Sequence, residues 1–476
     1  ANTTVHCTRT DTGTSIPYDG NPVTVPLPLN GGNEKQYKLE YYTDGTGFAA
    51  TPVKTVYYKV AKKYTVTFSV TGGNGTIQAN TGTPVPSGTV SVLHGGTVSF
   101  TATPTASGSW KIAGWTKGAD AVNGTNSTYT LSNVTSDTIV TVKFYQSKID
   151  GTAPMAWRAL LNAVKDAPSG ATLTIRGTIQ ATNHGSGDNA NYGRITIDKD
   201  LTITGEGGAG ILDANQLSPI FIVNYNKTFT LDHMTLKNGK KDAAPQYTGA
   251  TGCGVYTYGT FNMQDSTITN CEAVGDGGGV YLATSSSTFI MKNSTITGCT
   301  ATENGGGVCV SGGNFKMQGS SAITGCEAIG NTVNHKYGEG GGVYNKGTVK
   351  MTGGEIRNNK ARNGGGIDNN GTLILTNATL TGNTATFIGG ALCMSDGSSS
   401  EMTGGKIISN TCSGSGDGGG VYIHAGTFTL KSGASIESNT ADYGGGAYVG
   451  QNGTLIINGG SIKLNKAQSR GGGVYV

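Results

Sequence analysis

The chain has 476 residues, of which 79 are glycine and 13% are charged, and its formal net charge is +4 at pH 7. This weak charge, without a dense basic run, argues against a nucleic-acid partner. No stretch of eighteen apolar residues occurs, so the sequence predicts no membrane-spanning helix. With 35% hydrophobic residues, the composition is typical of a turn-rich β protein that has enough material for a core.

Residues 1–62 predict a small β module. A turn of sequence YDGNP at residues 18–22 precedes one strand-like stretch, and residues 56–60 (VYYKV) alternate as a strand does. This early Tyr-Asp-Gly turn with a late Val-Tyr-Tyr-Lys-Val strand resembles the Ig-like modules found in tandem on bacterial surface proteins.

Residues 63–147 predict a second β module. Its pieces are YTVTF at residues 64–68, GGNGTI at residues 72–77, GTVSFTATP at residues 96–104 and TVKF at residues 141–144. In this order they resemble the divergent B-repeat modules of internalin-type bacterial surface proteins. The resemblance implies a compact, non-catalytic spacer or adhesive module. For Trp110 and Trp115, packing is favoured over a ligand platform.

Residues 148–170 predict a linker and one helix. Trp157, Leu160, Leu161 and Val164 follow the i, i+3, i+4, i+7 pattern of an amphipathic helix over residues 154–167, and Pro154 suits its first turn. The helix directly precedes the first strand of a repeat region. We expect it to cap that region, because a bare solenoid end exposes apolar side chains and unpaired backbone groups.

Residues 171–476 predict a solenoid. Nine copies of a glycine cluster followed by an aliphatic residue run from Val255 to Val474, at a mean spacing of about 27 residues. Two further strand-like pieces follow each cluster, first at residues 261–263 and 266–268, with apolar and polar residues alternating. No long helical run interrupts them, so each strand must pair with its counterpart in the next copy. The fold class is therefore all-β, with a right-handed parallel β-helix of three strands per coil and about eleven rungs.

A cysteine or an asparagine recurs three positions after the isoleucine or leucine of the last strand-like piece in each copy. We expect a ladder there, in which asparagine amides bond to their neighbours or to local backbone groups. Two states are open for its thiols: a disulfide, which the rung spacing of about 4.8 Å allows, or reduced buried thiols, which the longer separation of in-register Cβ atoms favours. The ladder consists of Cys271, Cys299, Cys326, Asn359, Asn383, Asn410, Asn439 and Asn465.

The residue after each inward aliphatic is expected to face outward and is usually tyrosine. The favoured interpretation is tyrosine stacking that stabilises the sheet. The alternative is an aromatic face for a glycan, a host protein or a neighbouring rod. The stripe comprises Tyr256, Tyr281, Tyr344, Tyr422, Tyr448 and Tyr475.

The last residues, Gly473, Val474, Tyr475 and Val476, repeat the opening of a further copy. Either the natural polypeptide continues, which is favoured, or the open edge receives another molecule, as in head-to-tail self-association into filaments.

An enzyme is the alternative class, because parallel β-helices include pectate lyases and polygalacturonases. Those families need clustered carboxylates. Here we expect isolated, solvated turn carboxylates, and no histidine pair has metal-ligand spacing, so no metal or cofactor is predicted. The residues considered are Asp265, Glu272, Asp276, Glu355, Asp368, Asp417, His184, His233, His335 and His424.

The motif Gly389-Gly390-Ala391-Leu392 resembles the repeats of polymorphic outer-membrane proteins, found in bacterial adhesins and autotransporter passengers. The second half of that repeat departs from the family, because Phe261, Phe289 and Phe315 lack the following asparagine. The resemblance thus implies fold and surface location more than receptor binding. We expect a secreted or cell-surface bacterial protein, non-enzymatic, acting as a structural protein or adhesin. The start at Ala1 without methionine suits signal-peptide removal, and an excised piece would look the same.

Overall fold

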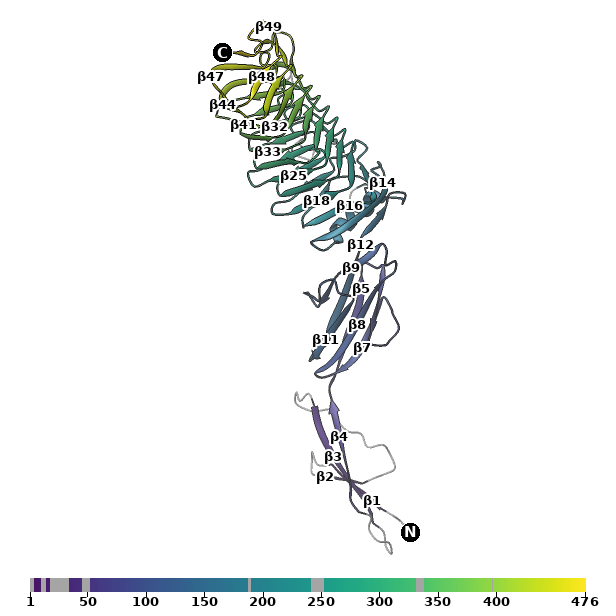
Figure 1. The fold of residues 1–476 in the computed structure, drawn as a ribbon. Coiled ribbons are helices and arrows are strands. Elements are labelled where there is room, and N and C mark those ends of the chain that lie inside the picture. Colours follow the sequence, from purple (N-terminus) through teal and green to yellow (C-terminus); the bar gives the residue numbers. More distant parts are fainter. Residues whose placement is uncertain are drawn as a thin grey trace. The chain divides into compact units, whose positions relative to one another are not determined.

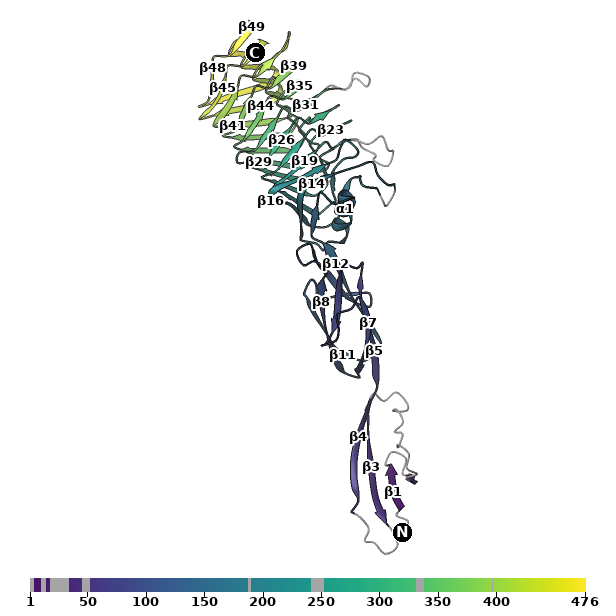
Figure 2. The same cartoon turned by 90° about the vertical axis from the view of Figure 1, so that its right-hand side faces the viewer.

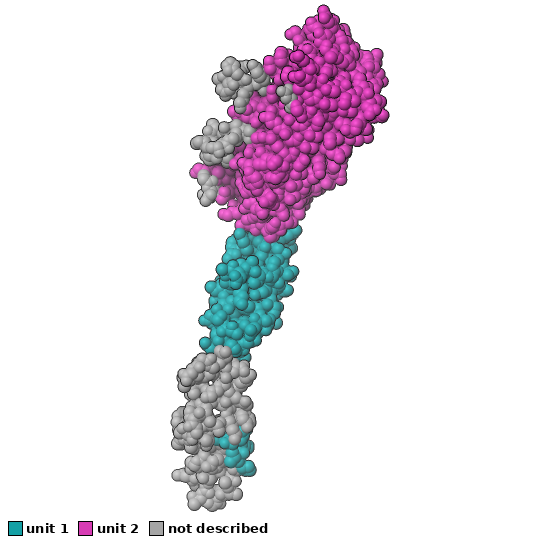
Figure 3. Space-filling model, turned by 90° about the vertical axis from the view of Figure 1, so that its left-hand side faces the viewer, with its two compact units in different colours: residues 1–145 teal, residues 146–476 magenta. Residues whose placement is uncertain are grey.

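The structure is a computed structural model and describes residues 4–9, 14–17, 34–44, 52–186, 190–240, 252–330, 338–395 and 397–476. The turn expected at residues 18–22 and His335 lie outside these ranges. The chain divides into two compact units, residues 1–145 and residues 146–476 (Figure 3).

Unit 1 begins with a four-stranded antiparallel sheet of order β2-β1-β3-β4. Long runs that alternate β-branched or aromatic residues with polar ones favour such strands. The strands are β1 (Thr4–Arg9), β2 (Thr14–Pro17), β3 (Glu34–Asp44) and β4 (Lys54–Ala61).

The rest of unit 1 packs two sheets around one core. A five-stranded sheet (β10-β9-β12-β5-β7) and a three-stranded sheet (β11-β8-β6) both contribute to it. Trp115 is buried there and its indole N–H donates to the Asn126 carbonyl at 2.8 Å, so it is a packing residue; Trp110 packs on the same core. The strands are β5 (Lys63–Thr71), β6 (Gly75–Ala79), β7 (Ser87–Leu93), β8 (Gly96–Pro104), β9 (Trp110–Lys117), β10 (Asp120–Val122), β11 (Thr128–Val134) and β12 (Thr138–Gln146).

Unit 2 is a parallel β-solenoid of about 11 turns (Figure 1). Each strand pairs in parallel with its counterpart one coil on, as Phe261 with Phe289 and Phe289 with Phe315. The predicted all-β solenoid with a spacing of about 27 residues, one helix and small sheets before it is confirmed. The first coils are less regular and contain β13 (Lys148–Asp150), β14 (Ala171–Gln180), β15 (Ile195–Ile197) and β16 (Leu201–Asp213).

The three main strands of successive coils form ladders within one 30-stranded sheet. The first ladder holds β17 (Phe221–Val223), β20 (Val255–Thr257), β24 (Val280–Leu282), β28 (Val308–Val310), β32 (Val343–Asn345), β36 (Ile367–Asn369), β40 (Leu392–Met394) and β50 (Val474–Tyr475). The second holds β18 (Thr228–Asp232), β21 (Thr260–Gln264), β25 (Thr288–Lys292), β29 (Asn314–Gln318), β33 (Thr348–Thr352), β37 (Thr372–Thr376) and β41 (Ser399–Thr403). In two late coils the first and second strands are continuous, as β44 (Val421–Lys431) and β47 (Ala447–Asn458). The third holds β19 (Met234–Lys237), β22 (Thr267–Thr269), β26 (Thr295–Thr297), β30 (Ala322–Thr324), β34 (Glu355–Arg357), β38 (Thr379–Thr381), β42 (Gly405–Ile408), β45 (Ala434–Glu437) and β48 (Ser461–Lys463).

A fourth, short strand in each regular coil was not predicted. These strands form a separate eight-stranded sheet, visible along one side of the solenoid in Figure 2. Several have only two residues, too few for an alternation pattern to be recognised. They are β23 (Glu272–Ala273), β27 (Thr300–Ala301), β31 (Glu327–Ala328), β35 (Lys360–Asn363), β39 (Thr384–Ile388), β43 (Thr411–Cys412), β46 (Thr440–Tyr443) and β49 (Lys466–Arg470).

The glycine clusters make the corner between the fourth and first strands. Gly364 has φ +57°, a conformation that side chains other than glycine rarely adopt. A Cβ on the next residue, Gly365, would lie only 2.4 Å from the Thr384 carbonyl oxygen of the next coil. Adjacent coils therefore approach too closely at this corner for any side chain.

The single helix, α1 (Ala156–Asp166), packs against β13, β14 and β15, the first strands of the solenoid (Figure 2). Trp157, Leu160 and Val164 are buried on this face, whereas Leu161 is only half-buried. The Trp157 indole N–H also donates to the Gly193 carbonyl at 3.0 Å. Within the described residues, no helix is both long and apolar enough to cross a membrane.

Candidate functional site

The first-strand ladder brings the predicted tyrosine stripe together, but with interruptions. Strand pairing places in order Tyr256, Tyr281, Cys309, Tyr344, Asp368, Cys393, Tyr422, Tyr448 and Tyr475. The stripe is therefore two tyrosine groups separated by Cys309, Tyr344, Asp368 and Cys393. Tyr344 is only 6% exposed, so the expectation that it faces outward is wrong.

The first tyrosine group surrounds Tyr256. Its ring centroid lies 5.0 Å from that of Tyr281 and 4.9 Å from that of Tyr258, and Tyr225 stacks on Tyr258 at 4.5 Å. Burial raises the pKa of Tyr256, and its hydroxyl donates to the Tyr258 hydroxyl at 3.3 Å. The Tyr256 phenol therefore stays neutral over the physiological range.

The second tyrosine group contains Tyr422, Tyr448 and Tyr475. Centroid separations are 5.0 Å between the first two rings and 5.2 Å between the last two. The Tyr422 and Tyr448 planes are 18° apart, so these rings cover one another's faces. All three are half-buried, which leaves mainly ring edges and hydroxyl groups to contact a ligand.

Between the groups lies a buried carboxylate, Asp368, with only 2% of its surface exposed. The expectation that it is a solvated turn residue is wrong, because β36 packs it between Tyr344 and Cys393 of the adjacent coils. The Asn370 side-chain amide donates to Asp368 Oδ1 at 2.6 Å. Burial, and then the negative charge of Glu339, raise the pKa of Asp368 to about 7.

Glu339 belongs to a further ladder, formed by Asp276, Asn304, Glu339 and Asn363, the residues directly before the glycines in four consecutive coils. The Asn304 backbone N–H donates to Asp276 Oδ1 at 2.9 Å, and the Asn363 amide donates to Glu339 Oε1 at 3.3 Å. Burial raises the pKa of Glu339 as well. Sequence reasoning missed this alternation of acids and amides, although its signal, a constant position before the glycines, was present.

Asp368 is poorly placed to donate a proton to a polymer. A general acid must reach within hydrogen-bond distance of the substrate, and Asp368 is almost fully enclosed. Its oxygens accept hydrogen bonds from Asn370 and the Cys393 thiol. The arrangement can hold a proton inside the fold, which makes the fold pH-sensitive.

Replacing Asp368 with asparagine is expected to change how stability depends on pH. The folded pKa of about 7 lies above the unfolded value of 3.8, so the folded state binds the proton more tightly. The stability contributed by protonated Asp368 is full below pH 3.8 and is lost as pH rises through about 7. Relative to wild type, the variant should gain roughly 4 kcal/mol between pH 4 and pH 8, since one pKa unit is about 1.4 kcal/mol. Urea unfolding at both pH values measures this, and an equal difference at both would contradict it.

The predicted asparagine ladder is continuous and buried through most of its length. The side-chain amides of Asn359, Asn383, Asn410 and Asn439 each donate to the next Oδ1 in the ladder, ending at Asn465, over 2.9 to 3.0 Å. Each of those oxygens also accepts the backbone N–H of the preceding ladder residue. The ladder is thus an internal scaffold, with no surface for a ligand.

The three thiols continue this ladder toward the N-terminus. Cys271, Cys299 and Cys326 are buried and free, and the Cys326 backbone N–H donates to Asn359 Oδ1 at 2.9 Å. Burial and the neighbouring Cys299 thiol raise the pKa of Cys326. This cysteine is therefore a protonated packing group, unsuited to nucleophilic chemistry.

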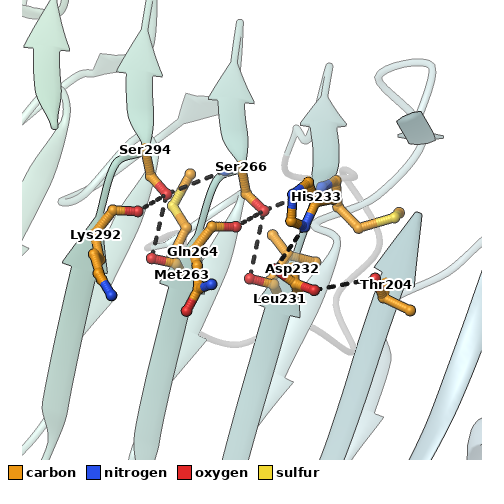
Figure 4. A network of polar contacts seen from close by, with 10 residues as sticks. Thr204, Leu231, Asp232, His233, Met263, Gln264, Ser266, Lys292 and Ser294 are labelled. Atoms are coloured by element: carbon orange, nitrogen blue, oxygen red, sulfur yellow. Dashed lines mark hydrogen bonds and ion pairs between the residues drawn. The ribbon is translucent and has the colours of Figure 1, made fainter. Parts of the chain in front are cut away.

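A serine ladder at the turn between the second and third strands was not predicted (Figure 4). Ser266 and Ser294 each donate to a backbone carbonyl two residues earlier, at 2.6 and 2.7 Å, and Ser321 donates to the Gln318 carbonyl. The Ser294 hydroxyl also accepts the Ser266 backbone N–H at 3.1 Å. Its signal was a serine directly before the third strand in three consecutive copies.

Beside the serine ladder, Asp232, His233 and Asp265 could hold a metal ion. Their ligand atoms all lie within 4.8 Å of one another, and Figure 4 shows Asp232 and His233 side by side. The sequence separates His233 and Asp265 by 32 positions, and only coil stacking brings them together. A borderline divalent ion suits imidazole and carboxylate ligands. The 2.8 Å contact between His233 Nδ1 and Asp232 Oδ1 would have to open, because both atoms already satisfy each other.

The predicted assembly edge is the last strand, β50. Val474 and Tyr475 pair on one side with Ala447 and Tyr448, and no described strand pairs with their other side. Val476 is 90% exposed. A following coil of the same polypeptide and a strand of another molecule would complete this edge with the same hydrogen bonds.

The fold and these sites define a parallel β-solenoid protein. Comparisons with protein-family models, with curated proteins and with solved structures gave no match.

Proposed function

We propose that this chain is a non-enzymatic structural protein or adhesin, secreted or displayed on a bacterial cell surface, whose outward tyrosine groups bind an elongated ligand such as a glycan chain. The observation that carries the proposal is the register of part-exposed tyrosines, such as Tyr422, Tyr448 and Tyr475, on successive coils. Hydroxyl groups repeated once per rung suit a ligand that is itself repetitive.

The interior supports a rigid display surface. The asparagine and serine ladders provide hydrogen-bond partners for buried polar groups in successive coils. The stacked phenylalanines fill the apolar core. A repeat array of this kind has a regular outer face, which such proteins use for extended binding surfaces.

The alternative is a polysaccharide lyase or hydrolase. The burial of Asp368 favours the non-enzymatic hypothesis, because a buried acid that the substrate cannot reach cannot transfer a proton to the substrate. Incubation with pectin and alginate is expected to release no unsaturated or reducing ends. Turnover that the Asp368→Asn variant abolishes would replace the proposal with the enzyme.

Binding tests the tyrosine groups directly. The full chain is applied to immobilised cellulose, chitin, pectin, heparin, collagen and fibronectin. The double variant Tyr422→Phe/Tyr448→Phe keeps the ring stack and removes two hydroxyl groups, so it should bind the retained ligand roughly five- to 150-fold more weakly, as each lost hydrogen bond is worth about 0.5–1.5 kcal/mol.

Tyr129→Phe is the matched control, because it makes the same change on a core ring of unit 1. It should bind as wild type does. Equal binding by the double variant would exclude the second tyrosine group as the contact surface, and the corresponding Tyr256→Phe/Tyr281→Phe variant tests the first group.

A further inference from the structure

A cavity of about 280 Å³ lies between α1 and β15, separate from the tyrosine groups. One wall is a single face of the helix: Arg158, Asn162 and Lys165 are spaced four and three residues apart. Among the described residues, neither Arg158 nor Lys165 forms an ion pair. Their positive charges therefore remain available to a ligand.

The opposite wall comes from β15 and the residues flanking it. Arg194, Thr196 and Asp198 alternate along the strand, so all three lie on the face that borders the cavity. Asp198 is the one acid in the lining, and Lys199 Nζ lies 3.6 Å from its Oδ1. Three cations against one partly neutralised carboxylate make the lining net positive.

Hydrogen bonds hold the helix against the strand region on the other side of the cavity. The Arg158 backbone N–H donates to Oδ1 of Asn191, whose surface is only 3% exposed. Lys199 Nζ donates to the carbonyls of Lys165 and Ala167 at 2.9 and 3.2 Å. Lys199 thereby offsets the partial negative charge at the end of α1, which would otherwise repel an anion.

We propose that this cavity binds an oxyanion, a carboxylate or a sulfate ester, carried by a ligand about the size of one sugar unit. Arginine side chains suit such groups because two parallel N–H donors match two oxygens. The half-buried Leu161 supplies an apolar group to the cavity, against which the non-ionic part of the ligand packs, whereas Val164 and Ile195 line it from almost fully buried positions. The volume lies near the lower end of the roughly 300–1,000 Å³ typical of ligand pockets. The site does not depend on the function proposed for the tyrosine groups.

Calorimetric titration of the full chain at low ionic strength tests the proposal. The probes are sodium glucuronate, sodium sulfate, a hyaluronan tetrasaccharide and, as the neutral control, glucose. We expect saturable binding of the anions and none of glucose. If sulfate and glucuronate bind, a small free oxyanion is sufficient for binding. If only the tetrasaccharide binds, the bound carboxylate belongs to an acidic polysaccharide.

Variants assign the binding to the cavity. Arg158→Gln/Arg194→Gln should weaken binding roughly tenfold or more for each arginine removed. The charge-matched control is Lys316→Gln/Lys350→Gln, on exposed positions of β29 and β33, which should bind as wild type.

The Asp198→Asn variant is expected to bind the anions more tightly, a result that a misfolded protein cannot produce. It removes the one carboxylate of the lining and should tighten anion binding severalfold. The proposal is overturned if all anions bind no better than glucose, if the arginine variant binds as tightly as the lysine control, or if Asp198→Asn binds more weakly than wild type.

Discussion

Replacing Asn410 with alanine is expected to destabilise the solenoid by about 4 kcal/mol. Asn410 Oδ1 accepts the backbone N–H and the side-chain amide of Asn383, at 2.8 and 3.0 Å. Its own amide donates to the Leu380 carbonyl and to Asn439 Oδ1. All of these groups are buried, and each one left without a partner costs about 1–3 kcal/mol.

Urea unfolding gives the total effect, and hydrogen exchange locates it. The Asn383 backbone amide should lose protection because it loses its acceptor, while the Asn359 amide keeps its bond to Asn383 Oδ1. Asn314→Ala, the same change on an exposed position of β29, should stay within about 0.5 kcal/mol of wild type. A loss below about 1 kcal/mol in Asn410→Ala would show that the ladder is dispensable.

Replacing Phe289 with alanine should cost about 3–5 kcal/mol, the usual range for a fully buried phenylalanine. Phe289 has no exposed surface, and its ring stacks between Phe261 at 5.1 Å and Phe315 at 4.8 Å. Removing the middle ring therefore leaves a cavity and two ring faces without a partner.

Phe289→Leu is the matched variant for this stack. The same ladder position holds Val349 and Leu373 two and three coils further on, so the coil tolerates aliphatic residues there. The leucine variant should lose less than about 1.5 kcal/mol, which thermal and urea unfolding can resolve. An equal loss in both variants would mean that stacking of rings, more than filled volume, stabilises this part of the core.

The effect of Asn410 could be anticipated from the sequence, whereas that of Asp368 could not. The ladder position of Asn410 is asparagine in five consecutive copies. The repeat therefore indicates that asparagines of adjacent coils are its neighbours. Asp368 stands where other copies carry tyrosine or cysteine, and its surroundings come from Glu339 and Cys393 on the adjacent coils. Because no other copy carries an acid at this position, the repeat pattern could not indicate that Asp368 is buried.

The sequence by itself determined the solenoid, its period of about 27 residues and its asparagine ladder, because these follow from a chemical pattern written once per coil. The tertiary structure decided which residues of different coils meet. Asp265 reaches His233 because stacking brings residues one coil apart in the chain close together, and Arg194 faces Arg158 across a cavity because α1 packs against β15. The repeat spacing predicts which recurring residues stack, but it does not predict these two meetings. Their residues do not recur in each copy, and the turns between ladders vary in length and set the final position of each side chain.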